Sequence, residues 1–126
     1  MPSKPVGWFE IYVQDMPRAK AFYQAVFALQ LERLDSPEAE IEMWAFPGPM
    51  DDGHGASGAL AKMPDGPSGV GGTLVYFMCE DCAVEAARVV PSGGSVMKEK
   101  FAIGQYGFIA LVTDTEGNLI GLHSMR

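Results

Sequence analysis

The chain has 126 residues, 48% of them hydrophobic and 20% charged, a composition typical of one globular domain and not of a disordered chain. Its formal net charge of -7 disfavours non-specific binding to nucleic acid or to an anionic membrane, because both need clustered Lys and Arg. No apolar run approaches the roughly 20 residues that span a bilayer, and two cysteines are too few for a disulfide framework, so we expect a cytoplasmic protein.

The first predicted element is a two-faced strand over residues 6–13, because side-chain character alternates along it with a period of two. One side carries Phe9, Ile11 and Val13, and the other carries Trp8, Glu10 and Tyr12. Asp15 follows as an N-cap and begins a helix of about a dozen residues. We expect this helix to pack inward through Ala19, Phe22, Tyr23, Val26 and Phe27. Three further strands are predicted at 29–34, 41–46 and 56–62.

A stretch rich in Gly and Pro over residues 63–72 is the one clear linker. After it the same order of elements returns: a strand over 73–79, a helix that Asp81 caps, and short strands near 95–98, 108–113 and 119–124. The apolar residues of this second helix recur at helical spacing, namely Ala83, Ala86, Ala87 and Val90. A turn over residues 114–118 (DTEGN) joins the last two strands.

This order is an internal repeat of one strand, one helix and three strands. Superposing Asp15 on Asp81 places Ile11 on Phe77 and Glu10 on Tyr76, so the two faces of the opening strands match. Side chains turned away from the helices must face something else, and the concave side of a curved sheet accommodates them. The sequence therefore predicts a single α+β domain over residues 1–126. Its two β-α-β-β-β modules, about 6–62 and 73–125, form a curved, open-barrel mixed sheet around a central cavity.

Three segments carry a resemblance to a known family: residues 7–15 (GWFEIYVQD), 18–23 (RAKAFY) and 114–118 (DTEGN). Together and in this order they resemble the vicinal oxygen chelate superfamily, which includes glyoxalase I, fosfomycin resistance enzymes, extradiol dioxygenases and bleomycin resistance proteins. The branch that looks most similar is the small glyoxalase-related proteins whose first strand begins W-F-E. The superfamily commonly closes its cavities through pairing of units, and open sheets leave strand edges unpaired, so we expect a homodimer.

The resemblance also implies a divalent metal on the concave face, held by side chains from the first and last strands of each module. The corresponding positions in this chain carry Trp8, Leu74, Gly58 and Gly121. None of these residues has a side chain that ligates a divalent cation. We therefore expect no metal at the standard site and no cofactor.

Glu10 is the most informative polar residue, since it lies in mid-strand on the face expected to line the cavity. An unpaired buried carboxylate is costly, so Glu10 should have a partner or stay neutral. It is interpreted either as a general base or ligand anchor, or as a carboxylate paired for structure. His123 shares the face of Gly121, and beside Glu10 it would form an acid–base pair or two ligands of a displaced metal. The alternative for His123 is a satisfied structural histidine.

Four aromatic side chains and one methionine suit the lining of an apolar pocket: Trp8, Tyr12, Trp44, Tyr76 and Met78. Plain core packing is the alternative, which we disfavour for Trp8 and Tyr76 because they face away from the helices. Tyr106 lies in a loop with a glycine two positions before it and another directly after it, and we expect this loop to bring it to the cavity mouth.

Two further features have a structural explanation. His54 lies in a Gly-rich stretch whose spacing matches no Ca²⁺ loop, so we expect a mobile loop there. Cys79 and Cys82 have the spacing of a redox motif, but the flanking order is not that of a thioredoxin-like domain. We expect structural thiols.

These features predict a protein that binds a small, largely apolar ligand in its cavity without the standard metal site, with Glu10 and His123 as catalytic groups or polar anchors. Resemblance to bleomycin resistance proteins, which bind their ligand without a catalytic metal, favours this reading. One alternative is a metal-dependent lyase, isomerase or dioxygenase with displaced ligands. The other is an association protein whose cavity is filled by side chains. No nucleic acid or membrane partner is expected.

Overall fold

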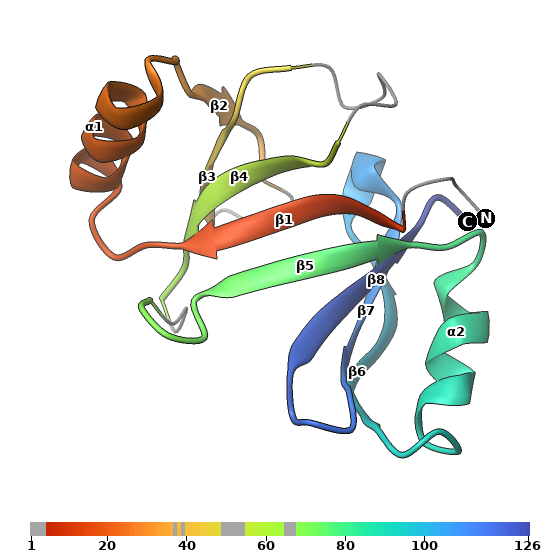
Figure 1. Cartoon of the computed structure of the whole chain (residues 1–126). Helices are drawn as coiled ribbons and strands as arrows, with labels where there is room; N and C mark the ends of the chain where they lie inside the picture. The colour runs from red at the N-terminus through yellow and green to blue at the C-terminus, as the bar shows by residue number, and fades with distance from the viewer. Residues whose placement is uncertain (1–4, 37, 39, 49–54, 65–67) are drawn as a thin grey trace. The chain divides into compact units, whose positions relative to one another are not determined.

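The structure is a computed structural model that describes residues 5–36, 38, 40–48, 55–64 and 68–126. The chain divides into two compact units (Figure 1). The first unit is Trp8–Thr73, and the second is Leu74–Arg126 together with Met1–Gly7. No helix in the described ranges is long and apolar enough to cross a membrane.

The first unit contains one helix, three whole strands and all but the first two residues of a fourth. These elements are β1 (Val6–Tyr12), α1 (Met16–Phe27), β2 (Glu32–Leu34), β3 (Glu42–Ala45) and β4 (Ser57–Lys62). The strands lie in the order β2-β3-β4-β1, with β1 parallel to β4 and the other pairs antiparallel. Asp15 caps α1 as predicted, because its side chain accepts a hydrogen bond from the Arg18 backbone N–H at 3.0 Å.

The second unit repeats this plan with β5 (Thr73–Met78), α2 (Cys82–Val89), β6 (Ser95–Ala102), β7 (Phe108–Thr113) and β8 (Leu119–Ser124). A short 3-10 helix, Gly104–Tyr106, connects β6 to β7. The strand order is β5-β8-β7-β6, and again the first strand is parallel to the last. Asp81 caps α2 through the Ala83 N–H. The predicted α+β repeat is confirmed.

The turn between β7 and β8 explains the D-x-x-G-N pattern. The Asp114 carboxylate accepts hydrogen bonds from the Asn118 side-chain amide and from the backbone N–H groups of Glu116 and Asn118. These donors, with the Asn118 side chain first among them, lower the pKa of Asp114. Gly117 has φ of 82°, a left-handed conformation that glycine adopts most easily.

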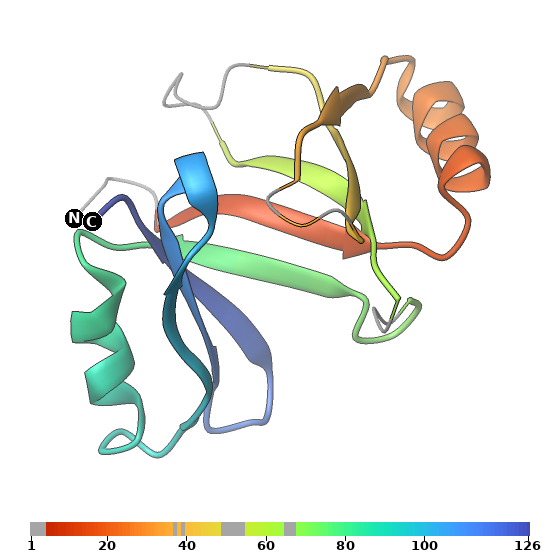
Figure 2. The same ribbon diagram turned by 180° about the vertical axis from the view of Figure 1, so that it is seen from behind.

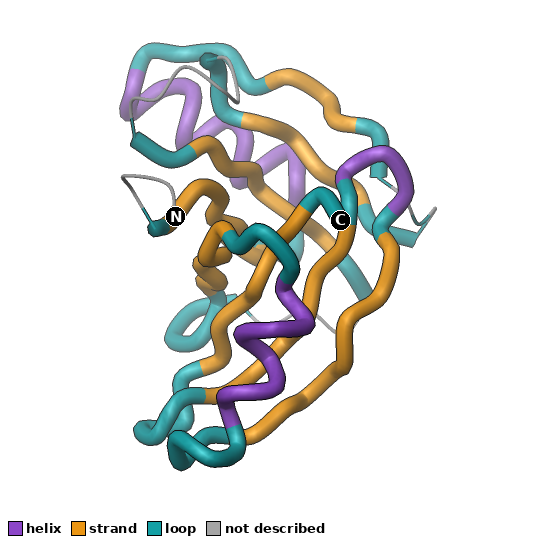
Figure 3. The backbone as a smooth tube through the Cα atoms, turned by 90° about the vertical axis from the view of Figure 1, so that its right-hand side faces the viewer, coloured by secondary structure: helices purple, strands orange, loops and turns teal. Residues whose placement is uncertain are grey.

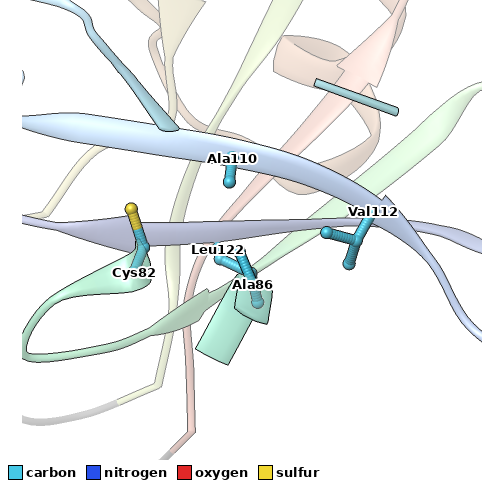
Figure 4. Packing of buried hydrophobic residues seen from close by; sticks show 5 residues of the cluster. All are labelled: Cys82, Ala86, Ala110, Val112 and Leu122. Atoms are coloured by element: carbon cyan, nitrogen blue, oxygen red, sulfur yellow. The ribbon is translucent and has the colours of Figure 1, made fainter. Parts of the chain in front are cut away.

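Helix α2 lies across the strands of the second unit (Figures 2 and 3). The core between them consists of Cys82, Ala86, Ala110, Val112 and Leu122, all at most 6% exposed (Figure 4). Phe77 and Ile120 pack against this cluster. Because side chains alternate along a strand, Tyr76, Gly121 and His123 belong to the opposite face.

Helix α1 packs less of its surface than predicted. Met16, Ala19 and Tyr23 contact the cluster around Leu31 and Leu60. Three residues expected in the core are instead more than half exposed: Phe22, Val26 and Phe27. The prediction was wrong because only one stripe of the helix, which includes Met16, Ala19 and Tyr23, packs on the sheet, and the three exposed residues lie outside that stripe.

Candidate functional site

The clearest polar arrangement in the first unit is a carboxylate held by two aromatic side chains of its own strand. The Trp8 indole N–H donates to Glu10 Oε2 at 3.1 Å, and the Tyr12 hydroxyl donates to Glu10 Oε1 at 2.7 Å. All three side chains are partly buried. They meet because residues two apart on a strand share one face. The predicted partner of Glu10 is thus its own pair of neighbours.

Small, buried side chains of the neighbouring strand β4 lie beside this carboxylate. Ala59 of β4 is level with Glu10 in the parallel pairing and is 0% exposed. Ala59, Ala61 and Met43 form a buried cluster against which Trp8 and Tyr12 pack. Each carboxylate oxygen can accept a second hydrogen bond. The arrangement therefore suits a ligand that brings a hydrogen-bond donor or a positive charge to this face.

Trp44 does not belong to this face. It packs with Met16, Leu31 and Leu60 on the side of the sheet that α1 covers. The Lys20 ammonium of α1 lies 3.2 Å from the centre of the Trp44 indole ring, and the indole N–H donates to Glu42 Oε2 at 2.9 Å. Grouping Trp44 with Trp8 and Tyr12 was therefore wrong, because β3 presents Trp44 to the helix and Met43 to the other side.

His123 is held by the loop before β7. Its Nε2 is hydrogen-bonded to the Tyr106 carbonyl oxygen at 2.5 Å. A carbonyl oxygen only accepts, so we infer that Nε2 carries the proton and that Nδ1 of the neutral ring keeps a lone pair for an acceptor or base role. Tyr106 contributes its backbone to this contact. Met78 is the register neighbour of His123 in the β5–β8 pair.

One of the positions at which the resemblance implies a metal ligand is filled by a neighbouring aromatic ring. A Cβ atom added to Gly121 would lie 2.2 Å from Tyr76 Cδ1, so the Tyr76 ring occupies the space of a side chain at position 121. Tyr76 and Gly121 are also register partners in the parallel pair. With Trp8 and Leu74 at the first-strand positions, these residues do not fit a divalent metal.

The assignment of Gly58 as the counterpart of Gly121 was wrong by one residue. A Cβ on Gly58 would lie 2.4 Å from the Phe9 ring, which packs against Phe46 on the helix side. Ala59 is level with Glu10 as Gly121 is level with Tyr76, so Ala59 is the true counterpart. The parallel register between first and last strands was the missing signal. Alanine is no metal ligand either.

Some predictions about the site stay predictions. Glu10 and His123 belong to different units, so their pairing and the cavity shared by the two modules are not resolved. His54 lies outside the described residues. Within the described ranges, no group of three or more His, Cys, Asp or Glu side chains is arranged to hold a metal ion.

The thiols have an environment that suppresses reactivity. Cys82 is fully buried in the second-unit core. Burial, and after it the nearby Glu85 carboxylate, raise the pKa of Cys79 to about 11. The neutral thiol is the favoured form in the folded protein, so the stability that it contributes is present below the ordinary thiol pKa and is lost as the pH rises through about 11.

We expect Cys79 in a Cys82→Ser variant to react with iodoacetamide at pH 7.5 about tenfold or more slowly than in the urea-unfolded chain, because the thiolate is the nucleophile. The native rate should keep rising towards pH 11. Mass spectrometry of quenched samples measures both rates. A native rate that levels off near pH 8 would show an activated thiol instead.

Comparison with known proteins places these features in a family. A family model described as the Glyoxalase/Bleomycin resistance protein/Dioxygenase superfamily matches residues 6–122. Proteins of Mycobacterium bovis and Mycobacterium tuberculosis named "Putative glyoxylase CFP32" are 29% identical over 129 residues, which is 92% of this chain and 44% of theirs. The chain thus spans less than half the length of these relatives.

Solved structures with the same fold cover nearly the whole chain. A Streptomyces coelicolor methylmalonyl-CoA epimerase variant in complex with 2-nitronate-propionyl-CoA has a TM-score of 0.70 and 18% identity, covering 96% of both chains. The hypothetical protein BH1468 from Bacillus halodurans has a TM-score of 0.72 and 13% identity, covering 98% of this chain and 96% of its own. At these identities the likeness shows the fold alone.

Proposed function

The chain belongs to the glyoxalase/bleomycin resistance protein/dioxygenase superfamily, and from that premise we propose that it binds a small, largely apolar ligand against Trp8, Glu10 and Tyr12. In this proposal the ligand is held without the superfamily's standard metal site. Glu10 is the polar anchor, and the two aromatic rings supply apolar contact.

The observation that carries the proposal is the double hydrogen bond to Glu10 from Trp8 and Tyr12. These bonds fix the carboxylate before a ligand arrives, which lowers the entropy lost on binding. They also leave acceptor capacity on both oxygens. An aromatic or aliphatic amine matches this arrangement, because its ammonium group binds the carboxylate and its apolar body stacks on the rings.

A second candidate is catalysis of the lyase, isomerase or dioxygenase type through Glu10 and His123. The observation that favours it is the fixed His123 ring, whose Nε2 is engaged by the Tyr106 carbonyl. The nitrogen Nδ1 then stands as the base or as one ligand of a displaced metal. This candidate requires the two residues to come together and at least one more donor for a metal.

The proposal is tested by binding of benzylamine to a Trp44→Phe variant, in which Trp8 is the one remaining tryptophan fluorophore. We expect benzylamine to quench the Trp8 fluorescence saturably. When Glu10→Gln is added to this variant, we expect benzylamine to bind about tenfold more weakly, because glutamine keeps an acceptor for Trp8 and Tyr12 but loses the charge. Benzyl alcohol should bind equally to both.

Glu32→Gln in the same background is the matched control, since it removes one exposed negative charge from β2. It should leave benzylamine binding unchanged. Equal loss in the Glu10 and Glu32 variants would show that net charge, and not the Glu10 arrangement, governs binding. Absence of any saturable signal at Trp8 would contradict the proposal.

The homodimer stays a prediction. Strand β6, which ends the strand order of the second unit, carries register shifts near Lys98. An irregular register and lysines on an edge strand both disfavour pairing with another chain. We therefore propose that a dimer would form through another surface. The exposed residues of α1 are one apolar area, with Phe22 57% exposed.

A further inference from the structure

A hollow separate from the Glu10 face lies in the first unit. It is a groove of about 560 Å³ at one end of the strands, a volume within the range of small-molecule sites. Two basic and two acidic side chains line it, together with apolar residues that include Val13 and Met63. The charged residues are Arg33, Glu40, Glu42 and Lys62, and we call this hollow the charged groove.

Strand pairing explains why three of these charges share a face. Glu42 lies directly opposite Lys62 in the β3–β4 pair, and Arg33 lies opposite Trp44 in the β2–β3 pair. Glu42 and Trp44 are two residues apart, so they point the same way. Trp44 belongs to the helix side of the sheet. The groove is therefore the part of that side that α1 leaves uncovered, on the face away from Glu10.

The four charged side chains of the groove form no salt bridge with one another in the part of the chain that the structure describes. The salt bridges within the described ranges are Lys100–Asp81 and Arg126–Glu80, both in the second unit. Glu42 is held in position because its Oε2 accepts the Trp44 indole N–H. The Arg33 guanidinium carbon lies 6.0 Å from the Trp44 ring centre, at the outer limit of a cation–π contact.

We propose that the charged groove binds a zwitterionic small molecule of the size of a dipeptide. Its ammonium group bonds to Glu42 and Glu40, its carboxylate bonds to Arg33 and Lys62, and its side chains lie on the apolar lining. A ligand with one sign of charge would meet two repelling groups, whereas a zwitterion satisfies both signs. Arg33, Glu40 and Lys62 are exposed, so each charge-assisted bond contributes modestly and the affinity comes from the four groups together.

The dipeptide Ala-Leu with free termini tests the proposal by ¹H–¹⁵N NMR titration of the wild-type chain. We expect saturable shifts of the Val13, Arg33, Glu42 and Met63 amides. N-acetyl-Ala-Leu and Ala-Leu amide each lack one terminal charge, and each should bind with an affinity lower by about tenfold or more. Equal binding of the blocked and free peptides would overturn the proposal, as would shifts that do not saturate at these residues.

Three variants separate the groove from a general charge effect. Arg33→Gln and Lys62→Gln should each weaken Ala-Leu binding about threefold, because both groups are exposed. Glu42→Gln, which keeps an acceptor for Trp44, should weaken it by a similar factor. Glu32→Gln is the control, because it lies beside Arg33 on β2 but is paired with Ala45, so it points to the other face. Unchanged amide spectra outside the groove check the fold. Unchanged affinity in all three variants would refute the site.

Discussion

Replacing Gly107 by alanine is expected to lower the free energy of unfolding by about 3–5 kcal/mol. Gly107 has φ of 97° and ψ of −129°, a backbone conformation that residues with a Cβ rarely adopt. A Cβ there would also lie 2.4 Å from the Ser124 carbonyl oxygen, so the backbone itself has to move. Strain and steric overlap therefore act together. Urea unfolding followed by circular dichroism measures the loss.

The same change should disturb His123. The Gly107 carbonyl accepts the Ile103 N–H at 2.8 Å, and this bond closes the loop that presents the Tyr106 carbonyl to the histidine. We expect the NMR signals of the His123 ring to shift in any folded fraction of the variant. An unchanged ring environment would show that the loop is not what positions His123.

Gly117→Ala is the matched control for the cost of placing a residue with a Cβ in a left-handed backbone conformation. Its φ of 82° is also left-handed, but a Cβ there would meet nothing within 4 Å. We expect a loss of about 1 kcal/mol. If both variants lost the same amount, the close approach to Ser124 would contribute nothing.

The second large effect is expected at the position of the superfamily's metal ligand. Gly121→Glu introduces a carboxylate there, yet we expect the unfolding free energy to fall by about 3 kcal/mol or more and no metal to bind. The Cβ of the new residue would lie 2.2 Å from Tyr76 Cδ1 and 2.4 Å from Cε1. Tyr76 is 7% exposed and has little room to move. We therefore expect the obstacle to a metal ligand at position 121 to be steric as well as chemical.

A double-mutant cycle isolates this steric term. Gly121→Glu should be less damaging when Tyr76→Ala has already opened the space, with a coupling energy of about 1–3 kcal/mol. Additive losses would show that the Tyr76 ring is not the obstacle.

Elemental analysis after dialysis measures the metal content of the wild-type chain and of Gly121→Glu, and we expect ratios near zero for both. Affinity requires several preorganised protein donors, and the four ligand positions supply none in the wild type. A metal-to-chain ratio near one that is lost in Glu10→Ala or His123→Ala would contradict this expectation. It would instead support a displaced metal site and a catalytic function.

The sequence by itself determined the order of the elements and the internal repeat, because caps, turns and side-chain periodicity are local properties. Asp15 and Asp81 cap the two helices as expected. It also determined that Trp8, Glu10 and Tyr12 share a face, since the alternation of one strand suffices for that conclusion. The partners of Glu10 follow directly from this spacing.

Only the tertiary structure decided which side of the sheet each further residue faces. Trp44 and Gly58 were placed on the Glu10 side, whereas strand pairing puts both on the helix side. A shift of one residue in register moves every side chain of a strand to the other face, and register depends on contacts between segments far apart in the sequence. The same long-range packing leaves Phe22 exposed and brings Arg33, Glu42 and Lys62 to one groove.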